Sequence, residues 1–206
     1  MQKDEPQFGA HNFFRDERTG FCYVVGNKDL KNYLGRIKIG EEYGMRSKYE
    51  FWGRGQRWVS NFTSIDELEP ILDNMAQGSV LTPSWAPAGR PYVYIGVGWW
   101  MESKIFCATA ENVEGPWDIH HIADATRLNE TSNFRYCVYP HEWSWNDKEG
   151  SLFVTWSEDN PSRVIGAELK FDHEKVTRGD KDSVRSGSGS GGFMSKVRSR
   201  IGSMSQ

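Results

Sequence analysis

Few side chains in this sequence have both the type and the spacing that a catalytic, metal or ligand-binding site requires. Trp99 and Trp100 follow the run YVYIGVG, where two adjacent rings at a strand end either pack in the core or give a flat surface on which a sugar ring stacks. Cys22, Cys107 and Cys137 lack the CxxC spacing of a zinc site, and three cysteines cannot all pair within one chain. We therefore expect each cysteine to act as a small buried apolar residue.

Most acidic residues lie where turns and loops are expected. Asp16, Asp147 and Glu149 fall in predicted hairpin turns, and Glu111 and Glu114 precede the sequence Gly-Pro-Trp. Carboxylates are favoured at such positions because they are solvated and hydrogen-bond the turn. None of these five is a candidate for catalysis on sequence grounds.

The composition is that of a folded chain with an aromatic core. Of 206 residues, 37% are hydrophobic, 14% are aromatic and nine are Trp, and the formal net charge is −3. These values exclude a chain that is disordered throughout. No apolar run reaches the roughly 18 residues of a membrane span, and the first residues lack the apolar segment of a signal peptide. We expect no membrane span and no signal peptide in this chain.

Most of the secondary-structure elements that the sequence predicts, and that would position a site, are β-strands. β-branched and aromatic runs bounded by Gly, Pro, Asn and Asp predict strands near residues 21–26, 92–98, 104–110, 151–157 and 163–171. One segment, 64–75, has helical spacing and starts with a capping-box pattern, Ser64 with Glu67, but contains Pro70. It predicts a short, broken helix between strands.

The strands recur in three groups. Gly9, Gly78 and Tyr139 hold equivalent places in these groups and lie 69 and 61 residues apart. A four-stranded meander repeated at nearly constant spacing is typical of propeller blades. The sequence thus predicts an all-β body of about three blades.

Several motifs occur in an order that resembles a known family. They are YEFWGRGQRW (49–58), GSV (78–80), AENVEGPW (110–117), YPHEW (139–143) and GSLFVTWSE (150–158). Together they resemble the five-bladed β-propeller family of largely unknown function that is related to arabinanases. That family includes bacterial endo-D-arabinanases and many fungal members, and its members are often secreted. The resemblance covers roughly residues 7–171 and implies a glycoside-hydrolase-like fold.

A closed five-bladed propeller with blades of this length needs on the order of 300 residues. The chain supplies about three blades, so we expect a partial propeller over residues 1–171. Either the chain is truncated, which we favour, or a partner completes the ring. Open sheet edges and faces of this kind invite self-association.

Glycoside hydrolysis requires two carboxylates on either side of the scissile bond. The resemblance implies that such groups project from the innermost strands, which here offer a single carboxylate, Glu142. It also implies that substrate contacts come from the same strands. Trp99 and Trp100, by their own position at a strand end, add a stacking platform if they are not packed in the core. The expected binding residues are His11, Asn12, Ser79, Tyr139, His141, Trp99 and Trp100.

Two interpretations of His141 stay open. In arabinanase-like propellers a His near this point faces the axis, where it approaches a bound cation or the sugar; otherwise it is a buried histidine packed between Tyr139 and Trp143. His120 and His121 fall on an expected outer strand, where they contact solvent and neighbours. No other metal site or cofactor is indicated by the sequence.

The last part of the chain differs in composition. Residues 183–206 are rich in Gly and Ser and carry Arg185, Lys196, Arg198 and Arg200 without an acid. We expect a flexible basic tail over 172–206 that lacks the aromatic residues of a dedicated nucleic-acid binder. Two functions remain open for the body: a glycoside hydrolase that is inactive as this chain, or a non-catalytic propeller fragment that binds carbohydrate or protein.

Overall fold

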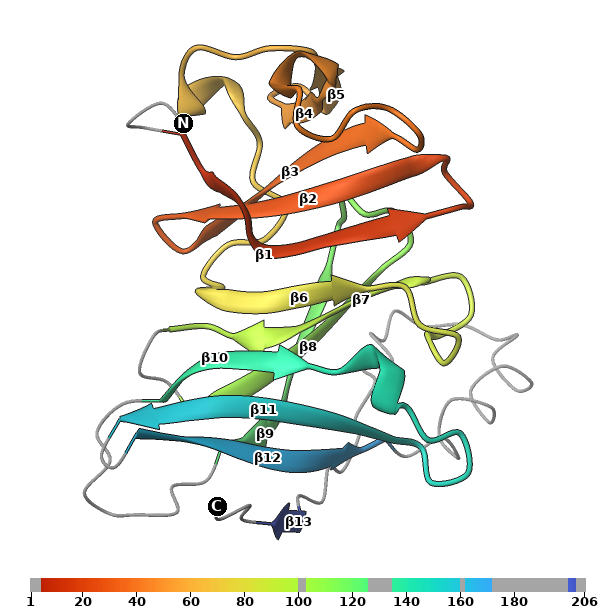
Figure 1. The fold of residues 1–206 in the computed structure, drawn as a ribbon, viewed down its shortest axis with the longest axis vertical. Helices are drawn as coiled ribbons and strands as arrows, with labels where there is room; N and C mark the ends of the chain where they lie inside the picture. The colour runs from red at the N-terminus through yellow and green to blue at the C-terminus, as the bar shows by residue number, and fades with distance from the viewer. Residues whose placement is uncertain (1–4, 100–102, 126–134, 160–161, 172–199, 203–206) are drawn as a thin grey trace, which may run out of the picture.

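The computed structural model describes residues 5–99, 103–125, 135–159, 162–171 and 200–202. These residues form three antiparallel sheets that follow one another along the chain (Figure 1). The sheets do not close into a ring. No helix in the described part of the chain is long and apolar enough to cross a membrane.

The first sheet has five strands in sequence order. They are β1 (Gln7–Asp16), β2 (Phe21–Lys28), β3 (Lys31–Lys38), β4 (Glu50–Gly53) and β5 (Arg57–Val59). A tight turn at residues 54–56 separates β4 from β5 within the motif YEFWGRGQRW.

The second and third sheets have four strands each, again in sequence order. The second sheet consists of β6 (Gln77–Leu81), β7 (Tyr92–Val97), β8 (Lys104–Ala110) and β9 (Asp118–Asp124). The third consists of β10 (Arg135–Pro140), β11 (Ser151–Asp159), β12 (Ser162–Lys170) and β13 (Arg200–Gly202). The predicted strands are confirmed, and β13 lies within the segment expected to be a tail.

The helix predicted over 64–75 is wrong. Only a single 3-10 turn forms, η2 (Ile65–Glu67), and two further turns of this kind are η1 (Arg46–Lys48) and η3 (Glu142–Ser144). The capping box of Ser64 and Glu67 is present, but Leu68 is already extended. Pro70 explains the early end, since proline has no N–H to donate and forces the preceding residue out of the helical region.

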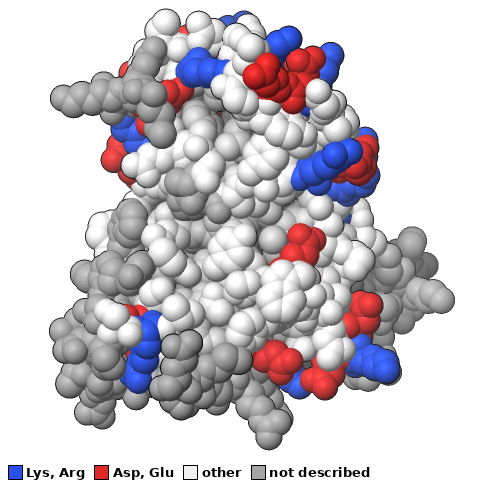
Figure 2. All heavy atoms as spheres, viewed as in Figure 1, with Lys and Arg blue, Asp and Glu red and all other residues white. Residues whose placement is uncertain are grey.

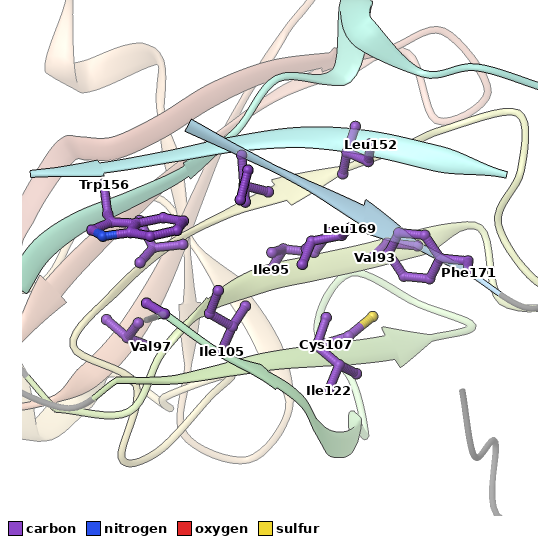
Figure 3. Packing of buried hydrophobic residues seen from close by; sticks show 14 of the residues in the cluster. Val93, Ile95, Val97, Ile105, Cys107, Ile122, Leu152, Trp156, Leu169 and Phe171 are labelled. Carbon is purple, nitrogen blue, oxygen red and sulfur yellow. The ribbon is translucent and has the colours of Figure 1, made fainter. Parts of the chain in front are cut away.

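Apolar side chains fill the spaces between neighbouring sheets. Between the second and third sheets, residues of β7 and β8 pack against Leu152, Trp156 and Leu169 (Figure 3). Tyr23 and Leu34 of the first sheet pack against Tyr92 and Tyr94 of the second sheet. The second sheet is therefore covered on both faces, as the six consecutive buried residues of β7 illustrate.

Candidate functional site

β1, β6 and β10 are the first strands of their sheets, and they lie side by side with the same direction in Figure 1. Side-chain amides join them. The amide of Asn12 in β1 donates to the Val80 carbonyl (2.6 Å) and accepts from the Val80 N–H (3.3 Å). The Gln77 side-chain oxygen accepts from the backbone N–H of Cys137 in β10. β10 contains a bulge between Tyr136 and Tyr139, so the Cys137 N–H is free to make this contact. β1 also has a bulge, between Phe8 and Asn12.

The ends of β6 and β10 meet at Glu142, which is the best candidate for a catalytic or ligand-binding residue. Glu142 begins η3 one residue after β10 ends, and its carboxyl group lies beside the backbone N–H of Thr82, the residue after β6. Glu142 is exposed as a whole residue, but partial burial of its carboxyl group raises its pKa, and the nearby Thr82 N–H opposes this shift only in part. Glu142 therefore keeps its proton to a higher pH than an ordinary glutamate does.

His141 contacts its own sheet. Its Nε2 lies 3.0 Å from Thr155 Oγ1, and its ring lies 5.3–5.6 Å, between centroids, from the rings of Tyr139, Trp143 and Phe153. Thr155 and Phe153 face away from the second sheet, because Val154 between them is buried in the core against it. The ring thus lies on the outer face of the third sheet, which differs from the expected position beside Asn12 and Ser79.

The surroundings of His141 do not fit a cation site. Partial burial lowers its pKa, so the imidazole is neutral at neutral pH, but its neighbours are aromatic rings and a hydroxyl rather than carboxylates. Within the described residues, no three His, Cys, Asp or Glu side chains are grouped to hold a metal ion. We derive no chemistry through a metal.

The other predicted binding residues do not converge on Glu142. Ser79 is buried, and the side chain of Asn12 is engaged by Val80. Trp99 is exposed but lies beyond the Gln77 end of β6, opposite the end where Thr82 and Glu142 meet. His11 falls in the bulge of β1, but its side chain is not among those described, and Trp100 lies outside the described residues.

Tyr139 is the predicted binding residue that lies exposed near the candidate site. It sits in β10, three residues before Glu142, and 48% of its surface is accessible. On the face that Figure 2 shows, charged side chains gather toward the rim and the middle, over β1, β6 and β10, is mostly uncharged. An uncharged surface with an exposed aromatic ring next to one carboxyl group suits a neutral polar ligand with C–H faces.

Sequence reasoning missed the structural importance of Asp16. This residue ends β1, is buried, and accepts hydrogen bonds from Arg18 Nε (3.0 Å) and Tyr92 Oη (2.7 Å). Burial alone would raise the pKa of Asp16, but the hydrogen bonds from Arg18 and Tyr92 outweigh it and lower the pKa. Because Tyr92 belongs to β7, the carboxylate ties the first sheet to the second. A turn-like sequence gave no sign of the distant partner.

The remaining predicted residues behave mostly as expected. His120 and His121 lie on β9, the outer edge of the second sheet, near Asp118 and Asp124 respectively. All three cysteines are free; Cys22 and Cys107 are buried. Cys137 is exposed, which contradicts the expectation of burial. Its φ of 59° places it at the bulge of β10, where the strand leaves the regular pairing with β11.

A comparison with solved structures finds a likeness of fold. A protein of Bacteroides ovatus described as a "putative hydrolase" superposes with a TM-score of 0.58 at 16% sequence identity. The match covers 74% of this chain and 38% of that chain, so this chain spans well under half of that protein. No protein-family model matches the sequence, and neither does any curated protein.

Proposed function

We propose that the three sheets are blades of a β-propeller related to glycoside hydrolases and that the chain binds carbohydrate where β6 and β10 end. Three observations support this: the first strand of every sheet runs beside that of its neighbour, the fold resembles that of a protein described as a hydrolase, and a carboxyl group lies at the strand ends. Ligand sites of propellers lie at such a central position.

The position of Glu142 where β6 and β10 end is the observation that carries the proposal. A glycosidic oxygen must gain a proton as its bond to the sugar carbon breaks, and a carboxyl group with a raised pKa stays protonated to a higher pH than an ordinary glutamate does. The half-exposed ring of Tyr139 offers an apolar surface for a sugar next to this turn.

A single carboxyl group supports binding rather than turnover by this chain. Asp16, the other acid at the end of a first strand, is buried and occupied by Arg18 and Tyr92. We therefore expect this chain to bind oligosaccharide without cleaving it. The same observation favours the second candidate, a non-catalytic carbohydrate-binding domain, in which Glu142 only hydrogen-bonds a sugar hydroxyl.

Calorimetric titration with arabino-, xylo- and cello-oligosaccharides tests the proposal. We expect one series to bind and Glu142→Ala to weaken its affinity by roughly tenfold or more, because a hydrogen bond to a carboxyl group is lost. Glu111→Ala, at an exposed acid in the loop after β8, is the matched control and should leave the affinity unchanged. Failure of all three series to bind contradicts the proposal. So does hydrolysis of an aryl arabinoside that survives Glu142→Gln, since the site would then lie elsewhere.

A further inference from the structure

The first and third sheets are the two ends of the stack, and their outer faces differ. The outer face of the third sheet presents a protruding tryptophan, whereas that of the first sheet contains an aromatic-lined hollow. We propose that copies of this chain associate head to tail, with Trp143 of one copy inserted into the hollow of the next.

The protruding side is an apolar patch, which we call the end patch: His141, Trp143, Phe153 and Val164. Trp143 is 81% exposed and Val164 is 63% exposed, the two highest values among the large hydrophobic residues of the described chain. Phe153 lies flat across Gly166 of β12, where an added Cβ would come within 2.3 Å of its ring. His141 packs between Phe153 and Trp143 and supports the indole from one side.

The receiving side, which we call the end hollow, has a volume of about 240 Å³. Its walls include the rings of Phe8, Tyr43, Tyr49 and Phe51, and Val24 also lines it. Val24 faces away from the second sheet, because its neighbours Tyr23 and Val25 pack against that sheet. The hollow therefore opens on the end of the stack opposite to the end patch.

The chemistry of the end hollow suits an indole ring. Arg46 lies at its edge, with its guanidinium 5.0 Å from the Phe51 ring centroid, and a guanidinium attracts the face of a further aromatic ring. Glu5 balances the charge of Arg46 through a 2.6 Å ion pair, so an uncharged ring meets no net charge. Gly44, also at the hollow, has no neighbour within 4 Å of its Cβ position, which leaves room for entry.

A second copy is the occupant that accounts for both features together. Each copy carries one protruding indole and one aromatic-lined hollow, at opposite ends of the stack. A contact between different surfaces of identical chains is heterologous, so it can repeat from copy to copy. A tryptophan that enters an aromatic pocket is also the commonest kind of residue to dominate an interface.

Sedimentation velocity of the full chain over a concentration series tests the association. We expect oligomers in the wild type and a dissociation constant raised more than about tenfold by Trp143→Ala, as for a dominant interface residue. The matched control is Trp99→Ala, which removes an equally aromatic side chain, 51% exposed, at the other end of β6. It should leave the association unchanged.

A mixing experiment identifies the two surfaces. Gly44→Trp should fill the end hollow without backbone strain, so this variant alone should be monomeric, as should Trp143→Ala alone. Mixed together, the first supplies an intact Trp143 and the second an intact hollow, so the mixture should form dimers and nothing larger.

Each of the following outcomes overturns the proposal. They are a wild type that is monomeric at all concentrations, an association that Trp143→Ala leaves intact, and a mixture of the two variants that stays monomeric. Loss of oligosaccharide affinity in Trp143→Ala without a change in association would instead assign the indole to the sugar site and also overturn the proposal.

Discussion

Glu142 is placed so that the fold favours its neutral form. The residue after β10 turns into η3, which brings the carboxyl group against the Thr82 end of β6, where burial raises its pKa. The folded state therefore binds the proton of Glu142 more tightly than the unfolded state does. Stability from this group is highest at low pH and falls as the pH rises above the unfolded pKa of about 4.3.

Glu142→Gln should remove the loss of stability that ionisation of Glu142 causes as the pH rises. At pH 7 we expect the melting temperature to rise, by at most about 3 °C, because glutamine carries no charge and can still accept from the Thr82 N–H. Below about pH 4 both side chains are neutral, so the gain should vanish. Thermal unfolding between pH 3.5 and 7.5 measures this, with Glu111→Gln as the control. A gain that is equal at all pH values would show that burial of the charge is not its cause.

At the scale of elements, the sheets are held together by a few polar contacts as well as by the apolar core. Asp16 and Tyr92 join the first sheet to the second, and Asn12 joins β1 to β6. The pKa of Asp16 is lowered in the folded state, so its ionised carboxylate stabilises the fold at pH values above the pKa of about 3.9 that Asp has in the unfolded chain. It is lost as the pH falls through the folded pKa.

Tyr92→Phe should destabilise the chain by about 1.5–3 kcal/mol at pH 7, because Asp16 loses a donor in a buried place. The loss should shrink as the pH falls far enough to protonate Asp16. Chemical denaturation at pH 7 and at low pH gives both values. Tyr43→Phe is the control, since this half-exposed hydroxyl accepts only a 3.4 Å contact from the Cys22 thiol. Equal losses in the two variants would show that the link between sheets is not important.

The sequence predicted the strands well because alternation and β-branched runs are local signals. The strand expected near 104–110, for example, is β8 residue for residue. It failed at 64–75, where Pro70 within the segment overrode the helical pattern, and it did not predict the bulges of β1 and β10.

The candidate site was predictable only in part. The expected repeat, in which Tyr139 is equivalent to Gly9 and Gly78, correctly indicated a first strand ending near Glu142. The position of His141 was not predictable, because it depends on Phe153 and Thr155 of the next strand, with which the ring makes its contacts.

In the molecule as a whole, the three sheets are stacked with their first strands, β1, β6 and β10, side by side. The ends of these strands therefore lie close together. The covered faces are those between sheets, where Trp156 and Tyr94 are fully buried. What remains accessible includes the line of β1, β6 and β10, the outer strand β9 and the two end faces. The sugar site and the end patch adjoin on the third sheet, because the Tyr139 ring contacts that of His141 and Glu142 directly precedes Trp143. A ligand at Glu142 and a second copy on the end patch should therefore compete for this part of the molecule.

The most direct test of the central claim is to locate bound sugar by amide chemical shifts. A ¹⁵N-labelled full chain is titrated with the oligosaccharide series that binds in calorimetry. The Thr82 amide is the reporter, since it lies beside the carboxyl group of Glu142. We predict saturable shifts of Thr82, Glu142 and Tyr139, and no shift of Thr109 on β8. Shifts that cluster in the end hollow around Tyr49, with Thr82 unmoved, would contradict the account.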